Sequence, residues 1–452
     1  MFKRIFCVCF CIIFIFSVLI VPTSAYTPTN FEVSAEGALI ANLDTGNILY
    51  SKNADKKLYP ASLTKLMTAL VFYESVSDLD GEIITVSENA INSLQGTDSS
   101  TGGLKIGEKL TARQMLYVLL LSSANDGANA IAEHVSGSVD AFVEKMNQRA
   151  TELGLTGTKY ANAHGLHDPM HYTTVNDMHI LTKKFLEVDV LKEICYSTKY
   201  KLDATNLSNS RTFTTTNFLL LNNGMKCTAE KYKNQAYYYK YAKGIKTGYT
   251  DAAGRCLIST ASKDGYNYLC ILMNCPVYDE KGKKIRLEFG DTKALYEWAF
   301  NDFEYKNVMS SGEIIGEAPV ELSWDTDYVS ACPAEGLSAM VPKISDSSTV
   351  TTNIRWYKKS YDAPIKKGDV LGECDVIYAG EIVDTVTLVA AGDVDRSSIM
   401  YMARGITHFF SDTIVSTTFI IIIAIIIVAI IAFIVTCMII NSPKKRRKKR
   451  RY

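Results

Sequence analysis

Cysteine is scarce in this 452-residue sequence and is not spaced as in a disulfide scaffold. Three of its 11 cysteines lie in residues 1–25 and one in an apolar segment near the C-terminus, so seven remain in the main body. An odd number of cysteines cannot all pair with one another. A body of this length can bury a hydrophobic core without disulfides. The cysteine content therefore excludes a small, disulfide-stabilised secreted domain.

The main body also lacks an excess of positive charge. The chain has 48 basic and 48 acidic residues, but eight basic residues form the run KKRRKKRR at residues 444–451 and two are Lys3 and Arg4. The remaining 38 basic residues face 48 acidic ones, a net charge of about −10. A nucleic-acid-binding groove needs clustered positive charge, so nucleic acid is not expected as a partner. The sequence shows no internal repeat and no long low-complexity segment.

The two ends of the chain predict export and membrane attachment. Residues 1–25 combine a basic start, an apolar run and small residues before Tyr26, which is typical of a signal peptide that is removed. Residues 414–440 contain no charge, and a helix of that length reaches roughly 40 Å against a hydrocarbon core of about 30 Å. A tilted transmembrane helix is therefore expected. Because basic tails stay in the cytoplasm, residues 441–452 place the body outside the cell membrane.

Two folded parts of different type are expected between these ends. Residues 26–304 mix strand-like alternation with helical periodicity, which predicts an α+β domain with an antiparallel sheet and helices. Residues 305–395 have β-branched runs, scattered glycines and little helical periodicity, so a small all-β domain should follow. Residues 396–413 then form a linker to the membrane.

Several elements of the first part can be placed by their turn and capping residues. They are a hairpin over residues 37–57, a helix starting near Pro60, a helix from Thr111 to about Ser122, helical sequence up to residue 155 interrupted at Gly137, three antiparallel strands over residues 242–275, and a helix over residues 295–303.

Ser62 and Lys65 form the first chemically informative pattern, Ser-x-x-Lys at a helix start. Taken alone, it is explained by an ordinary helix start in which Ser62 helps to cap the helix and Lys65 points to solvent. Ser123 and Asn125 form a Ser-x-Asn pattern, which is weak evidence because it occurs elsewhere and is usually a cap or turn.

The order of three motifs changes this interpretation. Lys246-Thr247-Gly248 occurs once, on the first expected strand of the antiparallel set. A helix-start Ser-x-x-Lys, an inter-helix Ser-x-Asn and a strand Lys-Thr-Gly follow each other in the order known from class A β-lactamases and penicillin-binding proteins. Together with the Ser-x-Asn and Lys-Thr-Gly motifs, the Ser-x-x-Lys motif predicts that Ser62 is a nucleophile.

With these motifs the sequence resembles the low-molecular-mass penicillin-binding proteins, specifically the serine-type D-alanyl-D-alanine carboxypeptidases. The resemblance extends from Phe31 to Asp395 and includes NAHGLHDPMHYTT (162–174), GIKTGYTDAAGRCLI (244–258) and the β-rich segment 363–394. It implies a penicillin-binding/β-lactamase-like domain, peptidoglycan stem peptides ending in D-Ala-D-Ala as substrates, and β-lactams as covalent inhibitors. No cofactor and no metal are expected.

Lys65 is predicted to be the base that activates Ser62. Helix geometry directs its side chain back toward Ser62. It can accept a proton at pH 7 only if its pKa falls by roughly 3 units, which corresponds to about 4 to 5 kcal/mol. Burial against the apolar helix and the cation of Lys246 both act in that direction.

The other motif residues have expected roles in binding and proton transfer. Ser123 can relay a proton to the departing amine, and Asn125 can hold the substrate backbone. Lys246 and Thr247, followed by Gly248, would bind the free carboxylate of the terminal D-alanine. The backbone N–H of Ser62 and, by resemblance, that of Tyr249 would form the oxyanion hole.

Three alternatives remain open. A related penicillin-recognising enzyme, such as a DD-endopeptidase or a β-lactamase, would share Ser62. A non-catalytic wall-binding protein is disfavoured by the complete motif set. A zinc peptidase could use the four histidines at residues 164, 167, 171 and 179, but no His-Glu-x-x-His pattern accompanies them. The expected anchor departs from the pattern of the family, because relatives commonly end in an amphipathic helix on the membrane surface and this sequence ends in an expected transmembrane helix.

Overall fold

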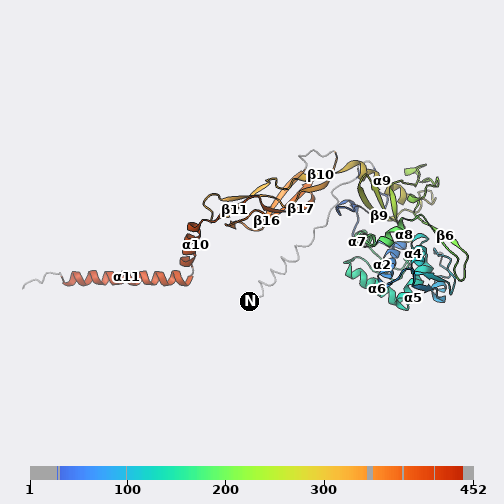
Figure 1. Cartoon of the computed structure of the whole chain (residues 1–452), viewed down its shortest axis with the longest axis horizontal. Helices are drawn as coiled ribbons and strands as arrows, with labels where there is room; N and C mark the ends of the chain where they lie inside the picture. Colours follow the sequence, from blue (N-terminus) through green and yellow to red (C-terminus); the bar gives the residue numbers. More distant parts are fainter. Residues whose placement is uncertain are drawn as a thin grey trace, which may run out of the picture. The chain divides into compact units, whose positions relative to one another are not determined.

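The computed structural model describes residues 28, 31–97, 99–343, 350–378, 381–411 and 413–440. The chain divides into two compact units. The first extends to Tyr305 and includes two short later segments, and the second begins at Lys306 and includes the C-terminal helices (Figure 1). The predicted signal peptide and basic tail lie outside the described residues.

A five-stranded antiparallel sheet forms the centre of the first unit, with the strand order β2-β1-β9-β8-β7. Its strands are β1 (Gly37–Asn42), β2 (Ile48–Lys52), β7 (Ala242–Thr250), β8 (Gly254–Lys263) and β9 (Tyr266–Cys275). The predicted hairpin and the three predicted strands are confirmed. The order brings the N-terminal hairpin against β9 and leaves β7, the strand with Lys-Thr-Gly, at the edge of the sheet.

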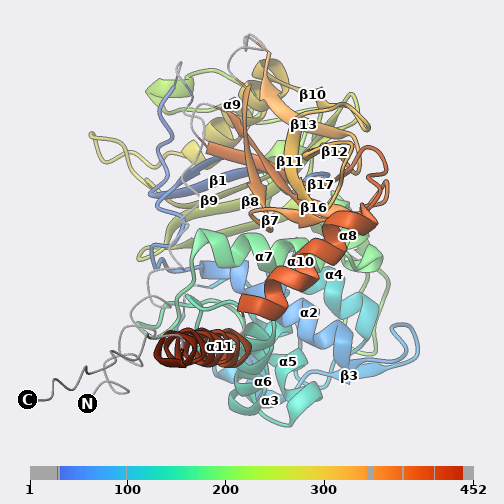
Figure 2. The same cartoon turned by 90° about the vertical axis from the view of Figure 1, so that its left-hand side faces the viewer.

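Both faces of this sheet are covered, because successive strand residues point to opposite sides. Leu39 and Ala41 belong to one hydrophobic core with most of the helices, whereas Ala38 and Ile40 belong to a second core with α9 (Leu287–Asp302). Figure 2 shows α9 on one side of the sheet and the other helices of this unit on the opposite side. The helices of the first face are α2 (Lys65–Ser75), α3 (Glu88–Asn92), α4 (Ala112–Leu121), α5 (Asn125–Ser136), α6 (Val139–Glu152), α7 (Val175–Leu186) and α8 (Asp189–Tyr196).

Capping residues set the ends of the helices near the motifs as predicted. The Thr111 hydroxyl accepts a hydrogen bond from the Gln114 N–H, and the Gln114 side chain accepts one from the Thr111 N–H, which is a capping box at the start of α4. α4 ends at Ser122. Gly137 ends α5 with φ 76°, a left-handed conformation that glycine adopts without steric strain. The turn between α4 and α5 is therefore fixed at both sides.

α9 is longer than predicted, since it begins eight residues before the expected start of 295–303. Charged residues and Gly290 hide the periodicity of its first turns. Tertiary contacts stabilise them instead: the Tyr232 hydroxyl donates to Asp291 at 2.7 Å, and a Cβ on Gly290 would lie 2.2 Å from the Tyr232 ring. The helix start therefore depends on a segment about 60 residues earlier in the chain.

The second unit contains the predicted all-β domain. Its six-stranded sheet has the order β14-β16-β17-β12-β11-β15. Residues of these strands form a hydrophobic core that includes Ala318, Val376 and Leu388. The strands are β11 (Gly316–Glu321), β12 (Tyr328–Pro333), β14 (Val350–Trp356), β15 (Tyr361–Asp362), β16 (Val370–Tyr378) and β17 (Glu381–Ala390). The smaller two-stranded sheets of the chain are β3 (Ile83–Thr85) with β4 (Lys109–Thr111), β5 (Lys199–Leu202) with β6 (Arg211–Thr214), and β10 (Phe303–Met309) with β13 (Leu337–Pro342).

Two helices follow the β domain. The segment expected as a linker is mostly helical, as α10 (Ser398–Ser411), and Arg404 attaches it to the domain by an ion pair with Glu321 at 3.1 Å. α11 (Thr413–Ile440) comes next. Within the described residues, one helix is long and apolar enough to cross a membrane, over Thr417–Ile439. This is consistent with a membrane anchor.

Candidate active site

Ser62 lies in the short 3-10 helix η1 (Ala61–Thr64), which leads directly into α2. Ala61 has φ 47°, a left-handed conformation that is strained for a residue with a Cβ. Strained backbone persists where the surroundings hold it, and it is common at functional sites. The Thr64 hydroxyl donates to the Ala61 carbonyl oxygen at 2.8 Å. The turn before α2 therefore presents Ser62 in a fixed orientation.

Lys65 is completely buried one turn after Ser62. Its Nζ lies 2.9 Å from Ser62 Oγ, 2.7 Å from Asn125 Oδ1 and 2.6 Å from the His164 carbonyl oxygen. Burial, followed by the charge of Lys246, lowers the pKa of Lys65 well below its ordinary value, while the charge of Asp126 acts in the opposite direction. This is the direction in which the pKa must move for Lys65 to act as a base.

The three contacts of Lys65 also determine where its lone pair points. A neutral amine has two N–H donors and one lone pair. The two carbonyl oxygens, of Asn125 and His164, can only accept, so they take both N–H groups. The lone pair is then left for the third neighbour, the hydroxyl of Ser62. This geometry suits proton transfer from Ser62 to Lys65.

Ser123 and Asn125 lie in the turn between α4 and α5. Asn125 is the first residue of α5, and its side-chain oxygen is the one in contact with Lys65. Ser123 is buried with φ 59° and precedes Asn125 by two residues. The structure therefore brings Lys65 into direct contact with both Ser62 and Asn125, and Ser123 lies two residues before Asn125 in the chain.

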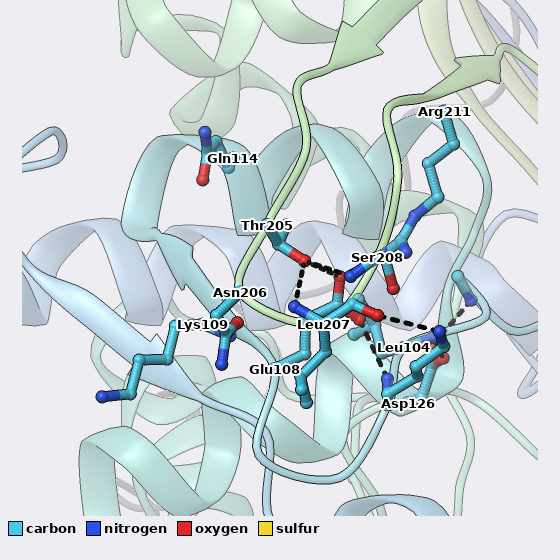
Figure 3. A network of polar contacts seen from close by, with 12 residues as sticks. Leu104, Glu108, Lys109, Gln114, Asp126, Thr205, Asn206, Leu207, Ser208 and Arg211 are labelled. Carbon is cyan, nitrogen blue, oxygen red and sulfur yellow. Dashed lines mark hydrogen bonds and ion pairs between the residues drawn. The ribbon is translucent and has the colours of Figure 1, made fainter.

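A polar network holds the start of α5 in place (Figure 3). The buried Asp126 carboxylate accepts hydrogen bonds from the N–H groups of Gly102, at 2.7 Å, and Leu104, at 3.1 Å. The same loop ends at Glu108, which is also buried and accepts a hydrogen bond from Thr205 at 2.8 Å. Arg211 lies 3.0 Å from Glu108 as its ion-pair partner. The network fixes the residue that follows Asn125.

Lys246 and Thr247 lie on β7. Lys246 is 1% exposed, and its Nζ donates to the Thr247 carbonyl oxygen at 2.9 Å. Burial lowers the pKa of Lys246 to about 7. The Thr247 hydroxyl lies 2.5 Å from the hydroxyl of Thr216, a residue outside the three motifs. Both side chains of the motif therefore have defined polar neighbours.

Gly248 allows β7 to pass close to the nucleophile. A Cβ at this position would lie 3.1 Å from the Pro60 carbonyl oxygen and 3.3 Å from the Ser62 nitrogen. A side chain here would force the strand and η1 apart. Tyr249 follows with a 37% exposed side chain whose hydroxyl donates to Asp251 at 2.5 Å. The Lys-Thr-Gly strand and the Ser-x-x-Lys turn thus meet directly.

The segment of residues 162–174 supports the nucleophile turn. The sequence does not indicate the individual roles of its residues. The Ala161 N–H donates to His171 Nδ1 at 3.0 Å, so the proton of this neutral ring is on Nε2, which faces the Thr64 hydroxyl at 2.7 Å. A Cβ on Gly165 would lie 1.8 Å from the Ala61 carbonyl oxygen. The HGL and HYTT sequences, taken from the resemblance, were the only signals for these contacts.

The fold and the site define a serine enzyme of the penicillin-recognising class, because an antiparallel sheet flanked by helices brings the three motifs together. A family model described as D-alanyl-D-alanine carboxypeptidase matches residues 23–276, and one described as penicillin-binding protein 5, C-terminal domain, matches residues 303–396. The chain belongs to the D-alanyl-D-alanine carboxypeptidase family.

Individual relatives agree with this family. The chain is 30% identical over 370 residues to D-alanyl-D-alanine carboxypeptidase DacF of Bacillus subtilis, which covers 81% of this chain and 87% of the relative. It is 29% identical over 280 residues to a D-alanyl-D-alanine endopeptidase of Pseudomonas aeruginosa, and the match covers 61% of this chain and 81% of the relative. The solved structure of penicillin binding protein 5 from Haemophilus influenzae is similar with a TM-score of 0.60 and 25% identity, over 82% of this chain and all of that one.

We predict that His171 makes the stability of the chain depend on pH. Burial lowers its pKa from 6.5 to about 4, so below pH 6.5 the unfolded state binds more protons than the folded state. The part of the folding stability that depends on a neutral His171 is fully present above pH 6.5 and is lost as the pH falls toward 4. Between pH 7 and pH 5 it should lower the free energy of unfolding by about 2 kcal/mol. Urea unfolding of the detergent-solubilised chain at both pH values, compared with His171→Gln, measures it. Equal pH dependence in the two proteins would contradict the prediction.

Proposed function

We propose that this enzyme releases the terminal D-alanine of peptidoglycan stem peptides through an acyl-enzyme at Ser62. The observation that carries the proposal is the buried Lys65, whose remaining neighbour after two carbonyl oxygens is the Ser62 hydroxyl. Serine is a weak nucleophile unless a base removes its proton, and a lysine can be that base only with a lowered pKa. The Lys65 pKa is lowered in this way.

The residues of the site account for the formation of the acyl-enzyme. Lys65 takes the Ser62 proton as Oγ attacks the carbonyl carbon of the penultimate D-alanine. The peptide bond breaks, Lys65 passes the proton that it accepted through Ser123 to the amine of the terminal D-alanine, and an ester to Ser62 remains. Water then hydrolyses the ester, which releases the shortened peptide and restores the hydroxyl. Asn125 holds the substrate backbone during these steps.

Backbone N–H groups stabilise the negative charge on the attacked carbonyl oxygen. We assign this role to the N–H groups of Ser62 and Tyr249, because Gly248 lets β7 come close to the Ser62 nitrogen. Each donor of such an oxyanion hole is worth roughly 3 to 4 kcal/mol. The start of α2 directly after η1 adds the favourable end of a helix dipole.

Lys246 and Thr247 are assigned to the substrate carboxylate. Both lie on the edge strand beside the nucleophile, where an ammonium and a hydroxyl can bind one carboxylate group. A cation held at this position suits a substrate with a free carboxylate next to the scissile bond, as in a peptide that ends in D-Ala-D-Ala.

We also propose a single-pass topology with the catalytic unit outside the cell membrane. Thr417–Ile439 would span the bilayer, and the eight consecutive basic residues that follow would stay in the cytoplasm. The substrate, β-lactams and the catalytic unit then share one compartment.

A fluorescent penicillin should label the protein covalently at Ser62. The β-lactam presents a strained amide and a carboxylate to the same residues as the peptide, and the resulting ester survives denaturing gel electrophoresis. Ser62→Ala should abolish the label and the release of D-alanine from a D-Ala-D-Ala peptide. Persistent labelling of Ser62→Ala would show that another residue is the nucleophile. Ser87→Ala, at the cap of α3, is the matched control and should label normally.

Lys246→Ala should discriminate between a substrate with a terminal carboxylate and its C-terminal amide. Loss of one contact to a charged group costs about 1.5 to 3 kcal/mol, roughly a 10- to 150-fold fall in kcat/KM for the acid. The amide lacks the charge and should lose little. Lys65→Ala should nearly abolish acylation by both substrates. Equal losses on acid and amide in Lys246→Ala would show that Lys246 acts by lowering the Lys65 pKa instead.

Protease added to intact cells without a wall should digest the catalytic unit. Only a C-terminal fragment with the span and the basic tail should survive, because the bilayer shields it. Immunoblots against the tail and against a cytoplasmic marker protein measure the result and the integrity of the cells. A catalytic unit that stays intact until detergent is added would reverse the proposed orientation.

A further inference from the structure

Thr216 is in contact with the carboxylate-binding motif although it belongs to none of the three motifs. Thr216 lies between β6 and the short helix η2 (Phe218–Leu220), 26 residues before the start of β7. Its Oγ1 lies 2.5 Å from Thr247 Oγ1, a short distance between two hydroxyls. The hydroxyl of Thr247 is therefore already hydrogen-bonded before any substrate arrives.

The backbone on both sides of Thr216 is fixed. The N–H of Thr215 donates to the Thr198 carbonyl oxygen at 2.9 Å. The Asn217 side chain donates to the Gly244 carbonyl oxygen on β7 at 2.8 Å, and Asn217 is 1% exposed. Thr216 thus cannot move away from β7 without breaking these contacts. Its hydroxyl is a constant neighbour of Thr247.

Proton counting limits what the two hydroxyls can do. Each hydroxyl has one proton to donate, and one of the two protons lies between Thr216 and Thr247. One proton is then left for a third group. If Thr216 is the donor, Thr247 keeps its own proton. The Thr247 hydroxyl can then rotate only as far as a lone pair of its oxygen still accepts the Thr216 proton.

We propose that Thr216 is a positioning residue that donates to Thr247 and thereby directs the Thr247 hydroxyl proton at the terminal carboxylate of the substrate. The inference rests on the proposed function, because it assigns Thr247 to that carboxylate. A fixed donor binds better than a freely rotating one, since less rotational freedom is lost on binding. Thr216 makes the site more selective for peptides with a free C-terminus.

The test compares acid and amide substrates on variants of the full-length protein in detergent. Thr216→Val keeps the shape of the side chain but removes the hydroxyl. It should raise KM for a D-Ala-D-Ala peptide about 2- to 10-fold, the usual range for one hydrogen bond, with a smaller effect on kcat. The C-terminal amide should be affected much less. Thr216→Ser, which retains the hydroxyl, should restore the wild-type KM.

Controls separate this role from a structural one. Thr214→Val changes an exposed threonine at the end of β6 and should match the wild type on both substrates. Thr216→Ala also lacks the hydroxyl and should behave like Thr216→Val, so a folding defect confined to the valine variant does not decide the result.

Four outcomes would overturn the inference. Three of them are equal losses on acid and amide, an unchanged KM for the acid without the hydroxyl, and a KM of Thr216→Ser that differs from that of the wild type. A lower KM in Thr216→Val would show that Thr247 donates to Thr216, the reverse of the proposed direction. If the wild type itself cleaves acid and amide equally, the assignment of Thr247 to the carboxylate fails first, and this result is visible before any variant is compared.

Discussion

The catalytic site depends on one constraint, the complete burial of the Lys65 amine. An ammonium group without solvent is costly, so burial favours the neutral form. The amine still needs polar neighbours, and it finds them on three segments: the nucleophile turn, the start of α5 and the turn at His164. Any displacement of one segment would leave a buried donor or carbonyl unpaired. The surrounding fold can be understood as the means of holding these three segments together.

Two of these segments, the start of α5 and the nucleophile turn, are supported by further contacts. The start of α5 is held by Asp126, which binds the loop that ends at Glu108. The nucleophile turn is held by Thr64 and His171, and Gly165 leaves room for its carbonyl groups. Apart from the side-chain contact between His171 and Thr64, these hydrogen bonds involve backbone groups, and their removal would leave buried polar atoms without partners. Buried polar networks of this kind fix geometry when every member is satisfied.

The sequence predicted the motifs, their order and most elements, because capping residues, turn residues and alternating strands are local signals. Thr111, Ser122 and Gly137 bound the helices where expected. It could not predict contacts between distant segments that lie outside the three motifs. Thr216 has no local pattern that points to Thr247, and the early start of α9 depends on Tyr232 rather than on periodicity. The residues of the site that were missed all act through such distant contacts.

The two buried lysines differ in their neighbours, and this difference separates their roles. Lys65 Nζ is held by two carbonyl oxygens beside the Ser62 hydroxyl, so the lone pair of a neutral Lys65 amine faces the nucleophile. Lys246 Nζ donates to the Thr247 carbonyl oxygen on the edge strand β7. Burial lowers the pKa of both amines, and the charge of Lys246 lowers the pKa of Lys65 further, because a cation disfavours a second cation nearby. A charged Lys246 therefore favours a neutral Lys65. That combination supplies a base and a carboxylate-binding group at once, which neither lysine could provide alone.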